Sequence, residues 1–173
     1  MPKHSTAPAT YFATARKEVI PLLPGKNLRI LEVGCGSGAT LAYLKNQGYC
    51  AWAAGVEIMP NPARQAKKVC DQFWAADIEA TALSLKPGSL DAILCLDVLE
   101  HLIDPWAVVQ KLSPLLRPGG VLIVSVPNLQ CYQITLPLVL RGRFDYTTMG
   151  LLDRTHLRWF TRPTAEALAT SGG

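Results

Sequence analysis

The segment Glu32–Gly38 reads E-V-G-C-G-S-G and continues directly from the apolar run Leu28–Val33. Its glycines allow the backbone to take up positive φ angles and to approach a ligand closely. A helical pattern over Ala39–Asn46 comes next, so the glycines occupy a turn from a buried strand into a helix N-terminus. In open α/β sheets, ligands bind at such turns at the carboxyl ends of strands. The segment therefore predicts an α/β fold with a ligand site at this turn.

Segments of the same two kinds alternate along the rest of the chain. We expect strands over residues 28–33, 51–57, 73–76, 90–96 and 121–126, and helices over residues 11–22, 39–46, 61–70, 104–116, 129–140 and 163–170. Residues 118–120, Pro-Gly-Gly, are expected to form a turn before the last strand. Alternating strands and helices favour a mostly parallel, doubly wound sheet, that is, a Rossmann-like three-layer sandwich.

One domain accounts for all 173 residues, because the sequence contains no internal repeat, low-complexity tract or linker. Within it we expect three parts. Residues 1–27 form an N-terminal helix and lead-in, residues 28–126 form the ligand-binding core, and residues 127–173 form a substrate or lid region.

The composition excludes several classes of protein. With 49% apolar and 17% charged residues, the chain is too apolar to be disordered. It has no apolar run of the roughly 20 residues that a membrane span needs, and its N-terminus lacks the apolar region of a secretory signal. The net charge of +4 is mild, so no nucleic-acid partner is expected. A loose basic group consists of Arg141, Arg143, Arg154, Arg158 and Arg162.

The cysteines indicate a reducing environment. There are five of them, an odd number, and none belongs to a C-x-x-C pair. Cys35 and Cys95 lie in or beside apolar runs, where thiols act as small apolar side chains. We expect all five to be reduced thiols and the protein to be cytoplasmic.

Two cofactors are compatible with the glycine segment taken alone. Residues 34–39 also satisfy the G-x-G-x-x-G/A pattern of dinucleotide-binding proteins, and Glu57 lies where either cofactor's ribose hydroxyls would be bound. Glu32 distinguishes between the two cofactors. A buried carboxylate is unfavourable beside a pyrophosphate but favourable beside the cationic amino acid of S-adenosylmethionine (SAM), which has no phosphates.

Further motifs follow in order, and with them the chain resembles the class I SAM-dependent methyltransferases, in the small-molecule branch of type 11/23 domains. Besides E-V-G-C-G-S-G, these motifs are Gly55–Ile58, Ala75–Ile78, Leu90–His101 and Leu116–Gly120. The resemblance implies a sheet in the order 3-2-1-4-5. No strong strand follows residue 126, so the strand 6–7 hairpin of this family is expected to be missing. Strand five would then be an exposed edge at which two copies could pair.

The resemblance also implies the cofactor contacts. Glu57 would bind both ribose hydroxyls, Ile58 would pack on the adenine, and Asp77 would accept a hydrogen bond from the adenine amino group. Asp97 would lie near the methionine end of SAM. The full expected set is Glu32, Gly34, Cys35, Gly36, Gly38, Glu57, Ile58, Asp77, Ile78 and Asp97.

The catalytic residues are less defined by the sequence. Asp97, Glu100 and His101 form a D-x-x-E-H pattern, and His156 lies further along the chain. One interpretation is that Asp97, Glu100 and His101 only shape the loop after strand four. The candidate catalytic groups are His156, His101 and Asp97. We expect no metal. The alternative is a divalent-metal site formed by all four, similar to sets in small-RNA 2′-O-methyltransferases and ubiquinone-pathway O-methyltransferases.

The region after strand five suggests the methyl acceptor. Candidate acceptor-binding residues are Asn128, Tyr132, Arg143, Tyr146 and His156, with Trp159 as a further lid residue. Residues 141–161 resemble methyltransferases of cell-surface glycan and natural-product pathways, and residues 138–143 resemble the methionine-biosynthesis protein W group. We therefore expect methyl transfer to a hydroxyl oxygen of a small metabolite or sugar. A non-catalytic SAM-binding partner protein and a nucleic-acid methyltransferase remain the alternatives.

Overall fold

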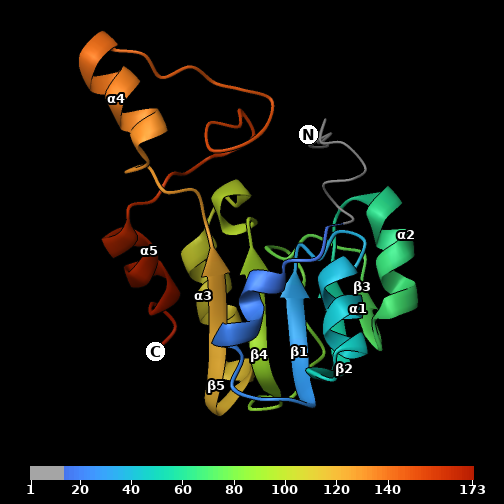
Figure 1. Cartoon of the computed structure of the whole chain (residues 1–173). Helices are drawn as coiled ribbons and strands as arrows, with labels where there is room; N and C mark the ends of the chain where they lie inside the picture. The colour runs from blue at the N-terminus through green and yellow to red at the C-terminus, as the bar shows by residue number, and fades with distance from the viewer. Residues whose placement is uncertain (1–13) are drawn as a thin grey trace.

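The computed structural model describes residues 14–173 and contains one sheet of five parallel strands in the order β3-β2-β1-β4-β5 (Figure 1). The strands are β1 (Leu28–Val33), β2 (Cys50–Val56), β3 (Gln72–Trp74), β4 (Leu90–Leu96) and β5 (Leu116–Ser125). Both the fold class and the strand order expected from the sequence are confirmed. Almost every residue of β1 and β4 is buried, as in a parallel sheet with both faces covered.

Helices cover both faces of the sheet and complete the three layers. One face carries the 3-10 helix η2 (Lys17–Leu22) with α1 (Ala39–Asn46) and α2 (Pro60–Val69), and the other carries α3 (Pro105–Leu112) and α5 (Arg162–Ala169). Each face of the sheet has its own hydrophobic core, and adjacent residues of a strand point into opposite cores. Ile30 packs among the residues of η2, α1 and α2, whereas Leu31 packs among those of α3 and α5.

Two helices differ from their predicted lengths because of proline. The helix expected over residues 104–116 ends at Leu112, and the 3-10 helix η4 (Ser113–Leu115) takes over, since Pro114 has no N–H to continue the α-helical hydrogen bonds. The helix expected over residues 11–22 is only the short η2, which contains Pro21. Residues 11–13 of that prediction lie outside the described residues.

The predicted Pro-Gly-Gly turn lies inside β5 instead of before it. Leu90 pairs with Leu116 and Ala92 pairs with Val121, so one residue of β4 faces four residues of β5, 117–120. The extra residues interrupt the pairing locally, and β5 continues past them to Ser125.

Residues 127–161, which we call the arm, leave the sheet after β5 and return to it at α5. The arm contains α4 (Tyr132–Arg141), which extends away from the body of the molecule (Figure 1). The helix begins three residues later than predicted, because Asn128 forms a turn in which its side chain accepts a hydrogen bond from the Gln130 amide at 2.9 Å. Beyond β5 the described residues form only two isolated bridges and no further strand, so β5 is an edge. None of the helices in residues 14–173 is long and apolar enough to cross a membrane.

Candidate functional site

The glycine turn leaves the carboxyl end of β1, next to β4, where the strand order reverses direction. Gly34 has a φ of 70° and Gly38, the N-cap of α1, a φ of 79°. Both angles strain any other residue. A Cβ on Gly34 would also lie 2.9 Å from Cγ2 of Val98, so only glycine lets the turn pack against the segment after β4.

Glu57, at the end of β2, is joined to this turn. Its carboxylate accepts hydrogen bonds from the Gly36 amide at 2.8 Å and from the Met59 amide at 2.7 Å. The side chain is buried, and burial raises its pKa. The acid that the sequence predicts for ribose binding therefore also fixes the shape of the glycine turn.

Glu32 lies just before the turn and is also buried. Burial raises its pKa to about 8, although a hydrogen bond with Thr40 opposes the shift. Its Oε2 atom has no hydrogen-bond partner among the described residues. A buried carboxylate with one unsatisfied oxygen favours a cationic group nearby, and the ammonium of an amino-acid cofactor supplies one. The residues present thus fit the amino-acid end of SAM.

The remaining residues predicted to contact the cofactor occupy varied positions. Ile58 is 59% exposed and presents an apolar surface beside Glu57. Asp77 begins a turn in which its carboxylate accepts a hydrogen bond from the Glu79 amide at 2.8 Å. The side chain of Ile78 is buried in the core, which leaves its backbone as the part able to reach a ligand. Cys35 is buried too, and its thiol faces Cys70 instead of open space.

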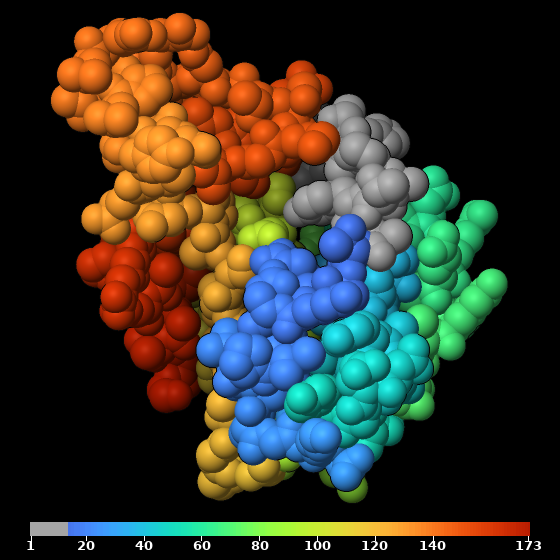
Figure 2. Space-filling view, in the orientation of Figure 1, coloured from blue at the N-terminus to red at the C-terminus, as the bar shows by residue number. Residues whose placement is uncertain are grey.

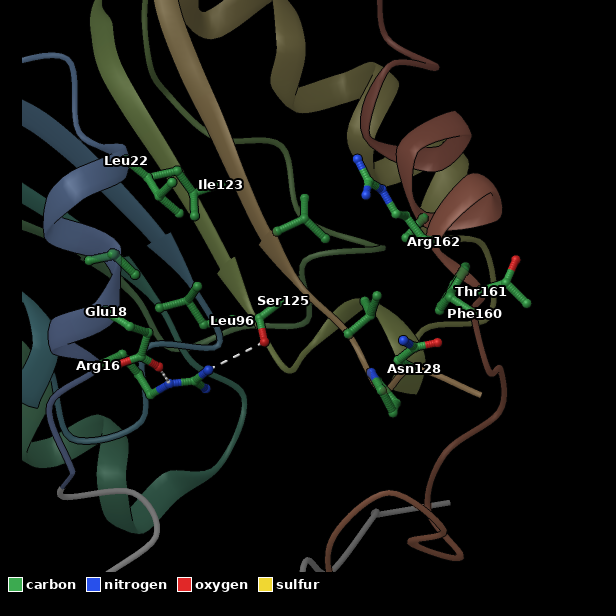
Figure 3. Close-up of a pocket in the computed structure, with 15 residues that line it drawn as sticks. Arg16, Glu18, Leu22, Leu96, Ile123, Ser125, Asn128, Phe160, Thr161 and Arg162 are labelled. Carbon is green, nitrogen blue, oxygen red and sulfur yellow. Dashed lines mark hydrogen bonds and ion pairs between the residues drawn. The ribbon is translucent and has the colours of Figure 1, made fainter. Parts of the chain in front are cut away.

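Asp97 follows β4 with an unusual positive φ of 53°. Its carboxylate accepts a hydrogen bond from the Ser125 hydroxyl at 2.7 Å and forms an ion pair with Arg16. Arg16 also reaches Ser125 at 3.3 Å, as Figure 3 shows. Sequence reasoning missed Arg16, because a single arginine ahead of β1 belongs to no pattern and only folding brings it to the ends of β4 and β5.

A groove of about 380 Å³ extends from these residues along β5, between η2 and α5 (Figure 3). Asn128 lies on its far wall with Phe160 and Arg162. The groove is on the open edge of the sheet and not in the β1–β4 crevice where the glycine turn lies. Figure 2 shows a separate hollow between the arm and η2, at the bottom of which residues near the end of β4 are visible.

Glu100, His101 and His156 form a compact cluster beside the crevice. Glu100 and His101 belong to the 3-10 helix η3 (Leu99–His101), which follows β4, and His156 belongs to the arm. One ligand atom from each of the three lies within 4.8 Å of the others, and His156 Nε2 is 3.9 Å from Glu100 Oε1. The structure thus brings together three of the four residues considered for a metal. The fourth, Asp97, is engaged with Arg16.

Backbone carbonyls orient both imidazoles of this cluster. His101 Nδ1 is 3.2 Å from the Thr155 carbonyl oxygen, and His156 Nδ1 is 3.3 Å from that of Leu151. Since a carbonyl only accepts, Nδ1 of His156 carries the proton in the neutral ring and its Nε2 carries the lone pair. His101 Nδ1 also lies 3.3 Å from the Thr155 hydroxyl, which can donate to it. Burial lowers the pKa of His156 and raises that of Glu100 to about 8. Both shifts favour the uncharged forms at neutral pH.

The other predicted acceptor residues lie along the arm. The ring centroids of Tyr146 and Trp159 are 5.8 Å apart, and those of Trp159 and His156 are 6.3 Å apart. An aromatic group therefore borders the cluster that contains His156. Arg143 forms an ion pair with Asp145, and Tyr132 is 68% exposed at the start of α4. Tyr146 and Trp159 are therefore grouped with His156.

Comparison with known proteins connects this geometry to a family. A family model described as a methyltransferase domain matches residues 9–172. The chain belongs to this methyltransferase family. The resemblance stated from the sequence is thereby confirmed, as is SAM for the cofactor. The match covers nearly the whole chain, including the glycine turn, Glu57 and the arm.

Individual relatives agree with the assignment. A ubiquinone biosynthesis O-methyltransferase of Xylella fastidiosa (strain M23) is 35% identical over 141 residues, which are 78% of this chain and 55% of that protein. The corresponding protein of Xanthomonas campestris pv. campestris (strain B100) is 29% identical over 73% of this chain and 52% of its own length. The chain thus spans about half the length of the curated relatives it matches.

Solved structures share the fold. A SAM-dependent methyltransferase from Archaeoglobus fulgidus superposes with a TM-score of 0.70 at 19% identity, covering 98% of this chain and 70% of that one. A SAM-dependent methyltransferase from Thermotoga maritima superposes with a TM-score of 0.66 at 23% identity, covering 90% of this chain and 67% of that one. At these identities, the likeness concerns the fold alone.

Proposed function

We propose that this domain is an enzyme that transfers a methyl group from SAM to a hydroxyl oxygen of a small molecule. The observation that carries the proposal is the cluster of Glu100, His101 and His156 after β4, in which Glu100 is buried and both histidines are partly buried. Val98, which packs against Gly34, joins the turn to the helix that holds Glu100 and His101. The names of the related O-methyltransferases support a hydroxyl acceptor for this chain.

Several residues of the crevice would hold the cofactor, which when bound supplies a methyl group on a positively charged sulfur. Glu57 would bind the ribose hydroxyls while retaining the Gly36 amide, and the exposed face of Ile58 would cover the adenine. Asp77 would face the adenine amino group. Glu32 and Asp97 would lie around the ammonium of SAM. Arg16, which is paired with Asp97, would be close enough to pair with the carboxylate of SAM as well.

His156 would act as the general base toward the acceptor. Its Nδ1 proton is directed at the Leu151 carbonyl, so Nε2 is left to accept the hydroxyl proton as the oxygen attacks. Burial keeps this ring neutral and therefore able to accept a proton. Glu100 and His101 position the ring from the side of β4, and His101 packs edge-on against it at 4.8 Å.

A metal ion bound by Glu100, His101 and His156 is a second candidate for activating the hydroxyl. Two details favour it: Glu100 Oε2 has no hydrogen-bond partner in residues 14–173, and backbone carbonyls orient both imidazoles. A chelator decides between the two. Activity that survives dialysis against EDTA supports a metal-free base, whereas loss that Mg²⁺ or Zn²⁺ restores supports the metal.

The first experiment is a calorimetric titration with S-adenosylhomocysteine, followed by product detection by mass spectrometry with a panel of phenolic, catecholic and sugar acceptors. Binding with a methylated product supports the proposal. Binding without product from any acceptor favours a non-catalytic SAM-binding protein. Product from RNA or DNA, with binding that weakens steeply as salt rises, favours a nucleic-acid methyltransferase.

Two further expectations belong to this proposal. All five cysteines are free thiols in the structure, which supports a cytoplasmic location. The unpaired edge of β5 carries partly exposed apolar residues such as Val121 and Val124 and supports pairing with a second copy. Sedimentation velocity tests the pairing, which predicts a dimer whose share grows with protein concentration.

A further inference from the structure

Two cysteines meet beneath the glycine turn. Cys35 lies within the turn, and Cys70 is the first residue after α2. The Cys35 thiol donates a hydrogen bond to the Cys70 sulfur. Neither residue is near the other in sequence, so the fold alone creates this pair.

Gly55 of β2 makes room for both sulfur atoms. A Cβ on this residue would lie 2.8 Å from Sγ of Cys35 and 2.8 Å from Sγ of Cys70. Gly55 is not among the glycines with positive φ, so its backbone does not require glycine. The space that the thiols occupy explains why no side chain is present there.

The two thiols differ in exposure and in ionisation. Cys35 is buried, whereas Cys70 is partly exposed. The hydrogen bond from Cys35 lowers the pKa of Cys70, and the nearby Lys45 ammonium lowers it further. Lys45 is held in place by the Asp71 carboxylate at 2.7 Å. The same hydrogen bond, together with burial, raises the pKa of Cys35. A partly exposed thiol with a lowered pKa beside a buried thiol suits oxidation followed by capture, because the thiolate is the form that reacts with peroxide.

We propose that Cys35 and Cys70 form a reversible disulfide on exposure to a peroxide, and that this disulfide weakens cofactor binding. The Cys70 thiolate attacks one oxygen of hydrogen peroxide, the O–O bond breaks, and Cys70 becomes a sulfenic acid while the released hydroxide takes up a proton. The Cys35 sulfur then attacks the Cys70 sulfur. The S–S bond forms, the S–O bond breaks, and hydroxide leaves with the Cys35 proton as water. One peroxide is reduced to two waters, and the two thiols lose two electrons.

The bond would act on the cofactor site through the glycine turn. A disulfide brings two sulfurs to about 2.05 Å, closer than a hydrogen bond between thiols, so Cys35 would move toward the end of α2. The Cys35 amide donates to the Val56 carbonyl at 3.1 Å, and the next amide, of Gly36, donates to Glu57 at 2.8 Å. Movement of this segment would displace Gly36 from Glu57. This step rests on the proposed role of Glu57 in binding ribose.

Hydrogen peroxide treatment, peptide mapping and calorimetry with S-adenosylhomocysteine test the proposal. We expect a peptide linked through Cys35 and Cys70, a loss of affinity of about tenfold or more, and full recovery with dithiothreitol. Cys70→Ser should bind as tightly as reduced wild type and keep its affinity after peroxide. Cys131→Ser, which changes a thiol in the arm, is the matched control and should respond as wild type does.

The outcomes separate the disulfide from the cofactor assignment. Oxidation that stops at Cys70 without a linked peptide overturns the disulfide, and a linked peptide with unchanged affinity overturns its effect on binding. Failure of reduced wild type to bind would disprove the cofactor roles and with them the switch, while peptide mapping still decides whether the disulfide forms. Circular dichroism of the oxidised protein distinguishes a local change from unfolding.

Discussion

The crevice and the arm place functional groups in different ways. In the crevice, Glu57 and the glycine turn are held by backbone amides at the ends of paired, buried strands. In the arm, β-structure is limited to isolated bridges, and much of α4 is exposed, including Val139 at 79% and Leu140 at 74%. A sheet fixes its strand ends through many cooperative hydrogen bonds, whereas a long connection tolerates sequence change. The residues proposed to bind the cofactor are thus fixed by the sheet, and the proposal assigns acceptor selection to the less constrained arm.

The arm meets the body beside the crevice at η3. The Leu157 and Arg158 amides donate to the Glu100 carbonyl at 2.8 and 3.2 Å, and His101 approaches the Thr155 carbonyl. This contact brings His156 of the arm beside Glu100 of the body. The comparison therefore predicts that changes in the arm reduce turnover or acceptor affinity, and that changes in the crevice reduce cofactor affinity.

The largest effect is expected from His156→Gln. Loss of a general base lowers the methylation rate by about 10²–10⁴-fold, while the affinity for S-adenosylhomocysteine stays within about twofold because the crevice is untouched. Steady-state kinetics and calorimetry measure the two quantities. A rate close to that of wild type would remove His156 from catalysis, and an equal loss of cofactor affinity would show that arm and crevice are not separable. Val139→Ala, at a 79% exposed position of α4, is the control within the arm.

The next effect concerns the crevice. Glu57→Gln replaces a carboxylate that would accept hydrogen bonds from both ribose hydroxyls, and hydrogen bonds to charged groups contribute about 1.5–3 kcal/mol each. We expect a fall in affinity for S-adenosylhomocysteine on the order of 10–100-fold. Because Glu57 also holds Gly36, the melting temperature is measured alongside. Unchanged affinity in a folded variant would contradict the ribose role.

A third effect is a pH dependence of stability from Glu32. Its pKa is raised from 4.5 to about 8 in the folded protein, so between these values the folded state binds a proton that the unfolded state does not. Stability without cofactor should therefore fall as pH rises from about 5 to 8, by at most about 1.4 kcal/mol per pH unit. Urea unfolding at several pH values measures this. Glu100, whose pKa is raised to the same value, contributes in the same pH window, so Glu32→Gln should make the curve shallower and the double variant with Glu100→Gln should flatten it further. A curve that is as steep in Glu32→Gln as in wild type would assign the dependence to other groups.

The smallest effect is expected from Tyr146, in the aromatic group of the arm. Tyr146→Ala removes one ring from the aromatic group around Trp159 and leaves the crevice intact. We expect the KM for the acceptor to rise about three- to tenfold, with kcat and cofactor affinity nearly unchanged, because only uniform binding is lost. A drop in kcat equal to the rise in KM would instead place Tyr146 at the reacting atoms.

Local patterns in the sequence determined the strands, and the family resemblance carried by the motifs gave their order and the cofactor. β1 and β4 have the predicted bounds because continuous apolar runs next to Gly and Asp leave few alternatives. The predictions failed where proline acted locally, at Pro114 and Pro21, and where pairing absorbed the Pro-Gly-Gly turn as a bulge. Glu32 and Glu57 could be predicted as cofactor residues because each lies at a recognisable position relative to the glycine turn and the strand ends.

Only the tertiary structure decided the contacts between distant segments. Arg16 meets Asp97, His156 meets Glu100, and Cys35 meets Cys70 across Gly55. The physical reason is that hydrophobic periodicity records which face of an element is buried but not which partner it meets. The sheet order and the return of the arm determine those partners. The amino-acid pattern thus determined a SAM-binding fold, and the packing of the folded chain selected which groups surround its crevice.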